Sequence, residues 1–129
     1  DYATVGAFCG VHQFCRVGAH AFMGGFTVAT KDVMPFSKTV GNRAKLYGVN
    51  SVGLRRRRMS LDAIAAIRGT YRTLFQSRMI LSAALAHWDR EGPHTPETRL
   101  LVEFIRSARR GVVFKRRRVF TDDGDPDQA

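Results

Sequence analysis

A six-residue repeat in the first thirty residues constrains the fold of this chain more than any other feature. Aliphatic side chains recur at every sixth position, and a small residue follows each of the first four by four positions. This period is typical of a chain that forms a short strand, turns a corner and repeats, so that successive coils stack as a solenoid. The aliphatic series is Val5, Val11, Val17, Met23 and, more weakly, Ala29, and the small residues are Cys9, Cys15, Ala21 and Thr27.

The same segment permits a second interpretation as a zinc site. Cys9, His12, Cys15 and His20 provide thiolate and imidazole groups at short spacing, which zinc prefers. Because side chains alternate along a strand, however, Cys9 and His12 face opposite sides of a hexad strand. We therefore favour Cys9 and Cys15 as small core side chains, and we predict no metal and no cofactor.

The repeat and the signals that follow it divide the chain into four predicted parts. The period stops beyond Thr30, and the next segment contains proline and glycine without sustained periodicity. We expect final solenoid coils at residues 1–34, a connector with a substrate-contacting loop at 35–59, a helical domain at 60–113 and a flexible charged tail at 114–129. Four hexads give few coils to stack, so we also expect that further coils precede Asp1 in the complete protein.

Three helices are predicted in the second half of the chain. Ser60 can cap the first, which carries an apolar stripe from Ile64 to Phe75, and the second covers Met79–Arg90. The sequence Thr95-Pro96-Glu97 is a helix start, and Gly111 provides a stop.

The formal net charge of +10 requires an explanation in terms of partners. A nucleic-acid module is the first alternative, since Arg55–Arg58 and Lys115–Arg118 are dense basic runs. The chain lacks an aromatic-interleaved basic strand of the kind that stacks bases, so we predict no nucleic-acid partner. It also lacks an apolar run long enough for a transmembrane segment. Two cysteines without a disulfide framework are typical of a reducing compartment, and a cytoplasmic location is expected.

Several segments in fixed order resemble one family of hexapeptide acyltransferases. The segments are "GVHQF", "VGAHAFMGG" and "KDVMPFSKTVGNRAKLYGVNSVGLRRR", and the resemblance runs from Asp1 to about Val113. They are similar to the C-terminal half of the UDP-N-acetylglucosamine O-acyltransferases that begin lipid A synthesis. The resemblance implies a mainly β plus α fold, in which the end of a left-handed parallel β-helix is followed by a small helical domain, and it implies a homotrimer.

The resemblance also implies a reaction and two anionic partners. A 3-hydroxyacyl group passes from acyl carrier protein to the 3-hydroxyl of UDP-N-acetylglucosamine, with a histidine general base and no cofactor or metal. None of the four histidines here matches the motif of that base, so we expect the base upstream and this chain alone to be almost inactive. Two alternatives stay open: another hexapeptide enzyme such as the UDP-3-O-acylglucosamine N-acyltransferase, and a non-catalytic trimeric binding module.

Substrate-binding residues follow from the resemblance position by position. His12 and Gln13 are implied to line a cleft between subunits, and Asn50, Arg56 and Arg57 are implied to hold the nucleotide. Paired arginines suit a diphosphate because the guanidinium fork matches phosphate oxygens. This chain has Val52 where the family carries glutamate.

Two further groups of residues receive roles. Gly25 is implied to limit the length of the acyl chain in its groove, beside Arg43, which stands where relatives often carry histidine. Arg68 and Arg72 are four residues apart on a predicted helix, and we interpret them as a docking strip for the acidic carrier protein. His20 is expected at a hexad corner with a structural role.

Overall fold

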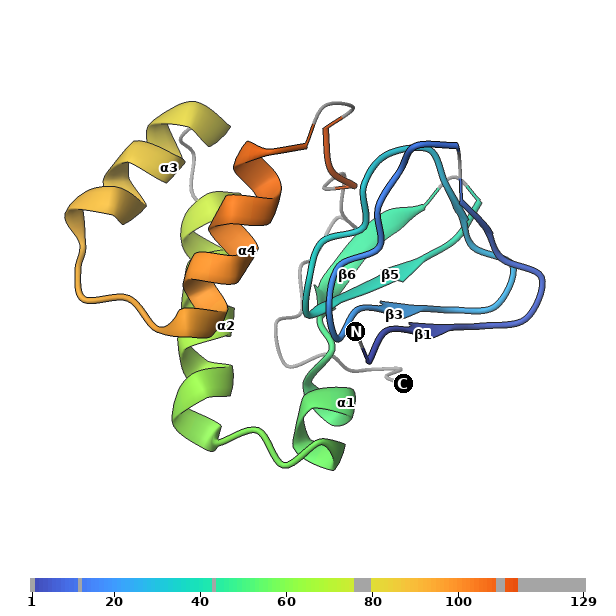
Figure 1. Ribbon diagram of the computed structural model, residues 1–129, viewed down its shortest axis with the longest axis horizontal. Coiled ribbons are helices and arrows are strands. Elements are labelled where there is room, and N and C mark those ends of the chain that lie inside the picture. The colour runs from blue at the N-terminus through green and yellow to red at the C-terminus, as the bar shows by residue number, and fades with distance from the viewer. Residues whose placement is uncertain (1, 12, 43, 76–79, 109–110, 114–129) are drawn as a thin grey trace.

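A computed structural model of the protein describes residues 2–11, 13–42, 44–75, 80–108 and 111–113. His12, Arg43 and the predicted tail at 114–129 lie outside these residues, as does Met79. Short β coils stack on one side of the molecule and three helices pack on the other, while a fourth short helix lies below the coils (Figure 1).

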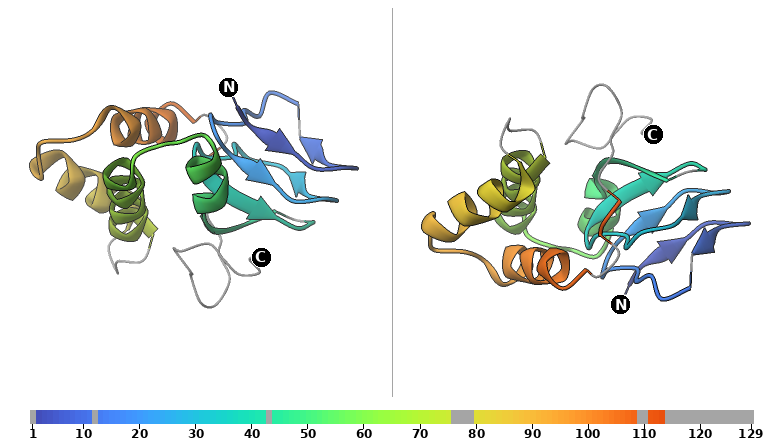
Figure 2. Two further views of the ribbon diagram at one scale, coloured as in Figure 1. Left: turned by 90° about the horizontal axis from the view of Figure 1, so that it is seen from below. Right: turned by 90° about the horizontal axis from the view of Figure 1, so that it is seen from above.

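The predicted solenoid is present, with three hexads in each of its first coils. Strand β1 (Thr4–Val5) pairs in parallel with β3 (Phe22–Met23), and β2 (Gly10–Val11) pairs in parallel with β4 (Val28–Ala29). In both ladders the paired residues are 18 positions apart in sequence. A parallel bridge between Val17 and Val33 marks a third side of the coil. The coils are seen as stacked layers in Figure 2.

The corners of the coils are left-handed backbone positions occupied mainly by aromatic residues. Tyr2, Phe8, Phe14, His20 and Phe26 have φ between 58° and 70° and recur every six residues. Rings 18 residues apart stack: Tyr2 on His20 with centroids 5.1 Å apart, and Phe8 on Phe26 with centroids 5.2 Å apart. This stacking offsets the strain that a non-glycine residue has in that backbone region.

The glycines of the hexads allow close approach between coils instead of forming the corners. A Cβ added to Gly18 would lie 2.4 Å from the backbone nitrogen of Pro35, and one added to Gly6 would lie 2.8 Å from that of Gly25. Of the two meanings that glycine has after an aliphatic residue, a turn or close packing, close packing therefore applies at these two positions.

The segment predicted as a connector continues the solenoid before it ends it. Strand β5 (Ser37–Val40) pairs in parallel with β3, with Lys38 opposite Phe22, and β6 (Lys45–Val49) then runs antiparallel to β5. The step from Phe22 to Lys38 is 16 residues, two fewer than in the preceding coil. The six-residue period is lost here because the coil shortens, while the ladder itself continues.

Four α-helices follow, one of which was not predicted. Ser60 accepts a hydrogen bond from the Ala63 amide at 3.1 Å, and Thr95 accepts one from the Thr98 amide at 3.2 Å, so both predicted caps are confirmed. The last helix ends five residues before Gly111, the predicted stop. The helices are α1 (Ser51–Arg56), α2 (Leu61–Phe75), α3 (Leu81–Arg90) and α4 (Pro96–Arg106).

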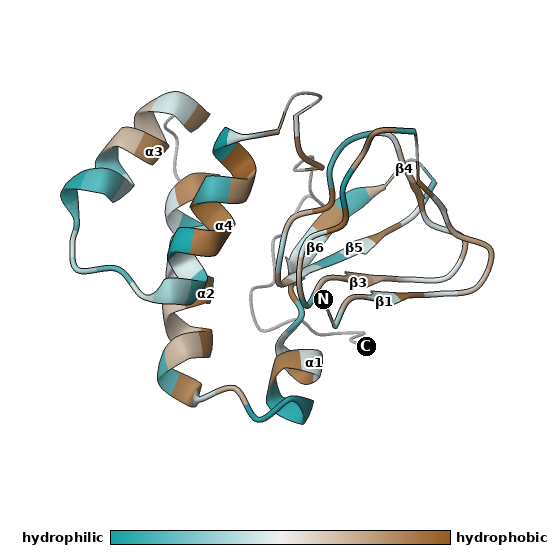
Figure 3. Ribbon diagram, in the orientation of Figure 1, coloured by the Kyte–Doolittle hydropathy of each residue, from teal (hydrophilic) through white to brown (hydrophobic). Residues whose placement is uncertain are grey.

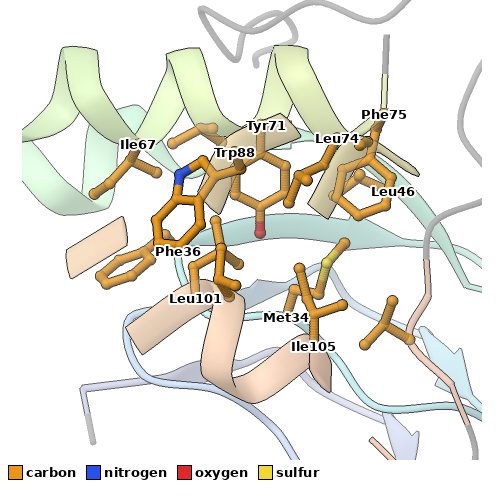
Figure 4. Close-up of a cluster of buried hydrophobic side chains, with 14 of the residues drawn as sticks. Met34, Phe36, Leu46, Ile67, Tyr71, Leu74, Phe75, Trp88, Leu101 and Ile105 are labelled. Carbon is orange, nitrogen blue, oxygen red and sulfur yellow. The ribbon is translucent and has the colours of Figure 1, made fainter. Parts of the chain in front are cut away.

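One apolar core joins the last coil to the helices. Tyr71 of α2 lies in this cluster, with side chains of the coil on one side and of α3 and α4 around it (Figure 4). Its hydroxyl donates a 2.7 Å hydrogen bond to the Pro35 carbonyl, and burial raises the pKa of Tyr71 well above its usual value. Helix α4 carries both apolar and polar residues along its length (Figure 3), and Leu101 and Ile105 are on its buried side.

The chain returns to the coils after α4. Asp32 is buried and forms a parallel bridge with Val112, through hydrogen bonds of 3.0 Å from its amide to the Gly111 carbonyl and 2.8 Å to its carbonyl from the Val113 amide. Residues 111–113, predicted as part of the helical domain, therefore lie against the coils. None of the helices in the described ranges is long and apolar enough to cross a membrane.

Candidate functional site

A pocket of about 650 Å³ opens between the coils and α1. Strands β1, β3 and β5 supply one wall, since residues of successive coils lie side by side in the sheet. The start and the end of α1 supply the other wall. The lining residues are Tyr2, Thr4, His20, Phe22 and Lys38 from the coils, and Asn50, Ser51, Val52, Gly53, Arg56 and Arg57 from the helix.

Asn50 fixes the helix wall of the pocket to the coil wall. Its side-chain oxygen accepts a 3.3 Å hydrogen bond from the Gly53 amide and so caps α1, while its Nδ2 donates a 3.0 Å hydrogen bond to the His20 carbonyl. A Cβ on Gly53 would lie 2.4 Å from Asn50 Nδ2, so glycine is needed at this position for the cap.

The pocket is strongly cationic. Lys38, Arg56 and Arg57 line it, and no aspartate or glutamate is among its lining residues. The Arg57 guanidinium lies over the ring of Tyr2, 4.5 Å from the centroid, which orients that charge at the pocket wall. Three cations without a carboxylate form a site for an anion that carries more than one charge.

His20 contributes a ring whose charge depends on its surroundings. It stacks between Tyr2 and Phe36, with centroid separations of 5.1 and 5.7 Å. Burial, and secondly the nearby Arg57 charge, lower the pKa of His20 below its usual 6.5. The imidazole is therefore neutral at pH 7 when the pocket is empty.

The structure brings three of the five predicted substrate-binding residues together. Asn50, Arg56 and Arg57 share the pocket, and Val52 lines it as a half-exposed apolar side chain. Gln13 is not among the residues that line it, and His12 lies outside the described residues. The clustering matches the motif, but it does not establish a role in substrate binding for any of these residues.

The two residues predicted for the acyl groove are separated from this pocket. Gly25 is exposed, and a Cβ added to it would have the Ala7 carbonyl oxygen at 3.6 Å as its nearest neighbour, an ordinary contact. Arg43 lies outside the described residues.

Arg68 and Arg72, predicted as one docking strip, have different environments. Arg72 is exposed in the last turn of α2. Arg68 is half-buried, and its Nη2 donates a 2.9 Å hydrogen bond to the Ser51 hydroxyl. Arg68 therefore contacts a residue of the pocket wall.

The cysteines give no support to the alternative zinc interpretation. The Cys9 thiol donates a hydrogen bond to the Gly24 carbonyl at 3.1 Å, and its side chain packs against a cluster of buried coil residues. Within the part of the chain that the structure describes, no group of three or more metal-ligating side chains is present.

Sequence reasoning missed the coil side of the pocket. Tyr2, Thr4, Phe22 and Lys38 were not singled out, and His20 was given only a structural role. The available signal was the length of the coil: Thr4 faces Phe22, which in turn faces Lys38, so an 18-residue step and then a 16-residue step find this wall.

Comparisons with known proteins agree with this arrangement. Residues 32–113 match the sequence profile of a family described as UDP N-acetylglucosamine O-acyltransferase, domain 2. An acyl-[acyl-carrier-protein]–UDP-N-acetylglucosamine O-acyltransferase of Burkholderia orbicola is 40% identical over 121 residues, which covers 88% of this chain and 45% of that protein. A protein of the same description from Burkholderia mallei is 39% identical over 117 residues, with the same coverage.

Solved structures show the same similarity. A UDP-N-acetylglucosamine acyltransferase from Bacteroides fragilis superposes with a TM-score of 0.83 at 36% identity, covering 88% of this chain and 44% of that one. A UDP-N-acetylglucosamine O-acyltransferase from Moraxella catarrhalis has a TM-score of 0.81 at 35% identity, covering 87% of this chain and 44% of that one. The chain spans less than half the length of the curated relatives that it matches.

Proposed function

The chain belongs to the UDP-N-acetylglucosamine O-acyltransferase family, and on that premise we propose that its protein transfers a 3-hydroxyacyl group from acyl carrier protein to the 3-hydroxyl of UDP-N-acetylglucosamine. This is the first step of lipid A biosynthesis. The printed names of the relatives contain both the acyl carrier protein and the sugar nucleotide. The present chain supplies a substrate-holding part of that enzyme.

The observation that carries the proposal is the cationic pocket. Arg56 and Arg57 offer forked donors that match phosphate oxygens, and Lys38 adds a third positive charge from the sheet. A diphosphate with one charge on each phosphate fits a pocket without carboxylates. The aromatic and amide groups at its other end, Tyr2, His20 and Asn50, suit the uncharged nucleoside.

The remaining predicted roles belong to the same proposal. His12 and Gln13 hold the sugar nucleotide from the coil, Gly25 and Arg43 border the acyl groove, and Arg72 contacts the carrier protein. Val52 places an apolar side chain at the nucleotide where the family has an acid, so one polar contact to the nucleotide is absent.

The chemistry is an acyl transfer from a thioester to an alcohol. The sugar hydroxyl oxygen attacks the thioester carbonyl as a general base takes its proton, the C–O bond forms, and the carrier thiol leaves as the C–S bond breaks. Backbone N–H groups stabilise the oxyanion of the tetrahedral intermediate. We assign none of the chain's histidines as the base.

The assembly and location complete the proposal. We infer a homotrimer of left-handed β-helices in the cytoplasm. Exposed apolar corner rings support association, since Phe8 is 80% and Phe26 is 68% exposed. The presence of both cysteines as thiols is compatible with a reducing compartment.

The test uses the full-length protein, 3-hydroxyacyl carrier protein and UDP-N-acetylglucosamine. We expect formation of the 3-O-acyl product, and we expect Arg56→Ala to raise the KM for the sugar nucleotide by about tenfold or more, since a charged hydrogen bond is lost. Acylation only of a 3-O-acylated glucosamine amine would instead identify the N-acyltransferase. Binding of UDP-N-acetylglucosamine without turnover would identify a binding module.

A further inference from the structure

Helix α1 carries the two arginines of the pocket, yet it has only six residues. A helix this short gains little stability from its own hydrogen bonds, so contacts from other elements fix its orientation. Its first turn is held on both sides: Asn50 donates to the His20 carbonyl of the coils at 3.0 Å, and Ser51 accepts from Arg68 of α2 at 2.9 Å. Both polar contacts are at the end of α1 where the pocket wall begins.

Ser51 is an internal link and not a surface residue. It is 1% exposed, and it lies between the cavity that it lines and the guanidinium of Arg68. Arg68 therefore lies behind the wall of the pocket, one side chain away from the cavity. Its positive charge has the same sign as Lys38, Arg56 and Arg57, which face the cavity itself.

The pose of Arg68 is not the one that a docking surface requires. A long cationic side chain on an exposed helix face normally extends its charged end into water. The Arg68 Nε is instead buried and has no hydrogen-bond partner, which is unfavourable for a guanidinium donor. Its neighbour Arg72, one turn further along α2, is exposed. The two residues thus have separate tasks.

We propose that Arg68 is a positioning residue of the anion pocket, which fixes the first turn of α1 through Ser51 and so directs Arg56 and Arg57 toward the diphosphate of a sugar nucleotide. This inference rests on the proposed function and deepens it. Arg68 does not contact the acidic carrier protein, and that task is left to Arg72 and the exposed surface around it.

The two roles for Arg68 predict opposite changes in the Michaelis constants of the full-length enzyme. If Arg68 positions the pocket, Arg68→Gln raises the KM for UDP-N-acetylglucosamine by about tenfold, the effect of one lost hydrogen bond to a charged group, and leaves the KM for the acyl carrier substrate unchanged. If Arg68 docks the carrier, the carrier KM rises and the nucleotide KM does not. Arg72→Gln is the matched variant and is expected to raise only the carrier KM.

Ser51→Ala tests the route without changing any charge. We expect it to weaken binding of UDP, measured by titration calorimetry, to the same extent as Arg68→Gln, and the double variant to be no weaker than either single variant. Arg68→Lys keeps the charge but has no fork, and we expect it to restore binding only in part. Thermal unfolding of each variant verifies folding, and Ser51→Ala serves alone if Arg68→Gln does not fold.

Each outcome decides between the two proposals. If the wild-type enzyme neither binds UDP nor turns over UDP-N-acetylglucosamine, the proposed function fails. If the wild type binds UDP while Ser51→Ala and Arg68→Gln bind it equally well, the positioning role is overturned and the proposed function stands. A rise in the carrier KM alone for Arg68→Gln also overturns it.

Discussion

Glycines of the coil differ in what a side chain would meet. A Cβ on Gly18 or Gly6 would collide with backbone atoms of the next coil, and a Cβ on Gly24 would lie 3.1 Å from a methyl carbon of Val40. At Gly25 the nearest neighbour would be at 3.6 Å, so packing within the chain does not require glycine there. A glycine that packing does not require is free to serve a ligand, which agrees with the role proposed for Gly25.

Gly25→Met is therefore predicted to change substrate choice without unfolding the protein. The longer side chain shortens the acyl groove, and the preferred donor becomes shorter by at least one or two methylene groups, with about tenfold or greater loss of kcat/KM for the original length. The measurement is kcat/KM for a series of 3-hydroxyacyl carrier proteins of increasing chain length. The thermal midpoint serves as the control and should not change. Unaltered length preference in a folded Gly25→Met enzyme would remove Gly25 from the groove.

His20 makes anion binding dependent on pH. Burial and Arg57 lower its pKa in the empty pocket, so it is neutral at pH 7 and takes up a proton only below 6.5. A bound diphosphate beside it favours the protonated form and raises the pKa again. Protonation is then stronger in the complex than in the free protein, and the affinity for UDP-N-acetylglucosamine is expected to increase as the pH falls. The groups that face His20 are Arg57, Arg56 and Lys38 across the pocket and the ring of Tyr2.

The measurement is the Kd of UDP-N-acetylglucosamine from about pH 8 to pH 5. His20→Asn is the control variant, because asparagine tolerates the left-handed backbone at this corner, where φ is 58°. We expect a several-fold gain in affinity for the wild type and a flat profile for the variant. In the absence of ligand the sign is reversed: the unfolded chain protonates more readily than the folded one, so the lowered pKa makes folding less favourable as the pH falls below 6.5. Equal pH profiles for wild type and variant would exclude His20 from the binding equilibrium.

At the scale of elements, the features that local sequence determines were predicted and those that depend on register were not. The caps of α2 and α4 are short-range signals, since Ser60 and Thr95 bond to amides three residues later. Helix α1 has a cap of the same kind at Asn50, but six residues are too few to show a helical period. Its existence depends on the coil and on α2, which lie far away in sequence.

The coil side of the pocket was invisible for the same reason. Arg56 and Arg57 are adjacent in sequence and form a motif, so they were identified directly. Lys38 joins them only because a coil shortened by two residues places it beside Phe22. The shortening also removed the six-residue period that would have extended the predicted solenoid beyond Thr30. Long-range register, and not residue type, decided what was missed.

At the scale of the whole molecule, one arginine of the coils holds the helices in place. Arg16 donates 2.8 Å hydrogen bonds from its backbone amide and its Nε to the carboxylate of Asp32. The same guanidinium donates to the Phe104 carbonyl and the Ser107 hydroxyl at the end of α4, both at 2.9 Å, and lies 4.0 Å from the centroid of the Phe104 ring. Asp32 also receives residues 111–113, so the end of α4 and the segment after it meet the coils at this residue pair.

Arg16→Met is predicted to destabilise this junction. The Asp32 side chain is 3% exposed and would lose its cationic partner, while its hydrogen bond from the residue 16 amide stays. Because the Arg16 side chain is itself 41% exposed, the loss is smaller than for a fully buried pair, and we expect about 1–3 kcal/mol in the free energy of unfolding. Denaturant unfolding of the full-length protein measures it. Hydrogen exchange should show the loss of protection at residues 111–113, whose amides bond to this part of the coils.

A double-mutant cycle separates the ion pair from the other contacts of Arg16. In an Asp32→Asn background the carboxylate charge is absent, so Arg16→Met loses only its contacts with α4 and its effect is expected to be smaller. The arginine would then link coil, helix and returning segment through two independent sets of bonds, to Asp32 and to α4. Equal effects of Arg16→Met in the two backgrounds would show that the link to α4 alone stabilises the junction. No effect in either background would mean that the apolar core around Tyr71 is sufficient to hold the helices against the coils.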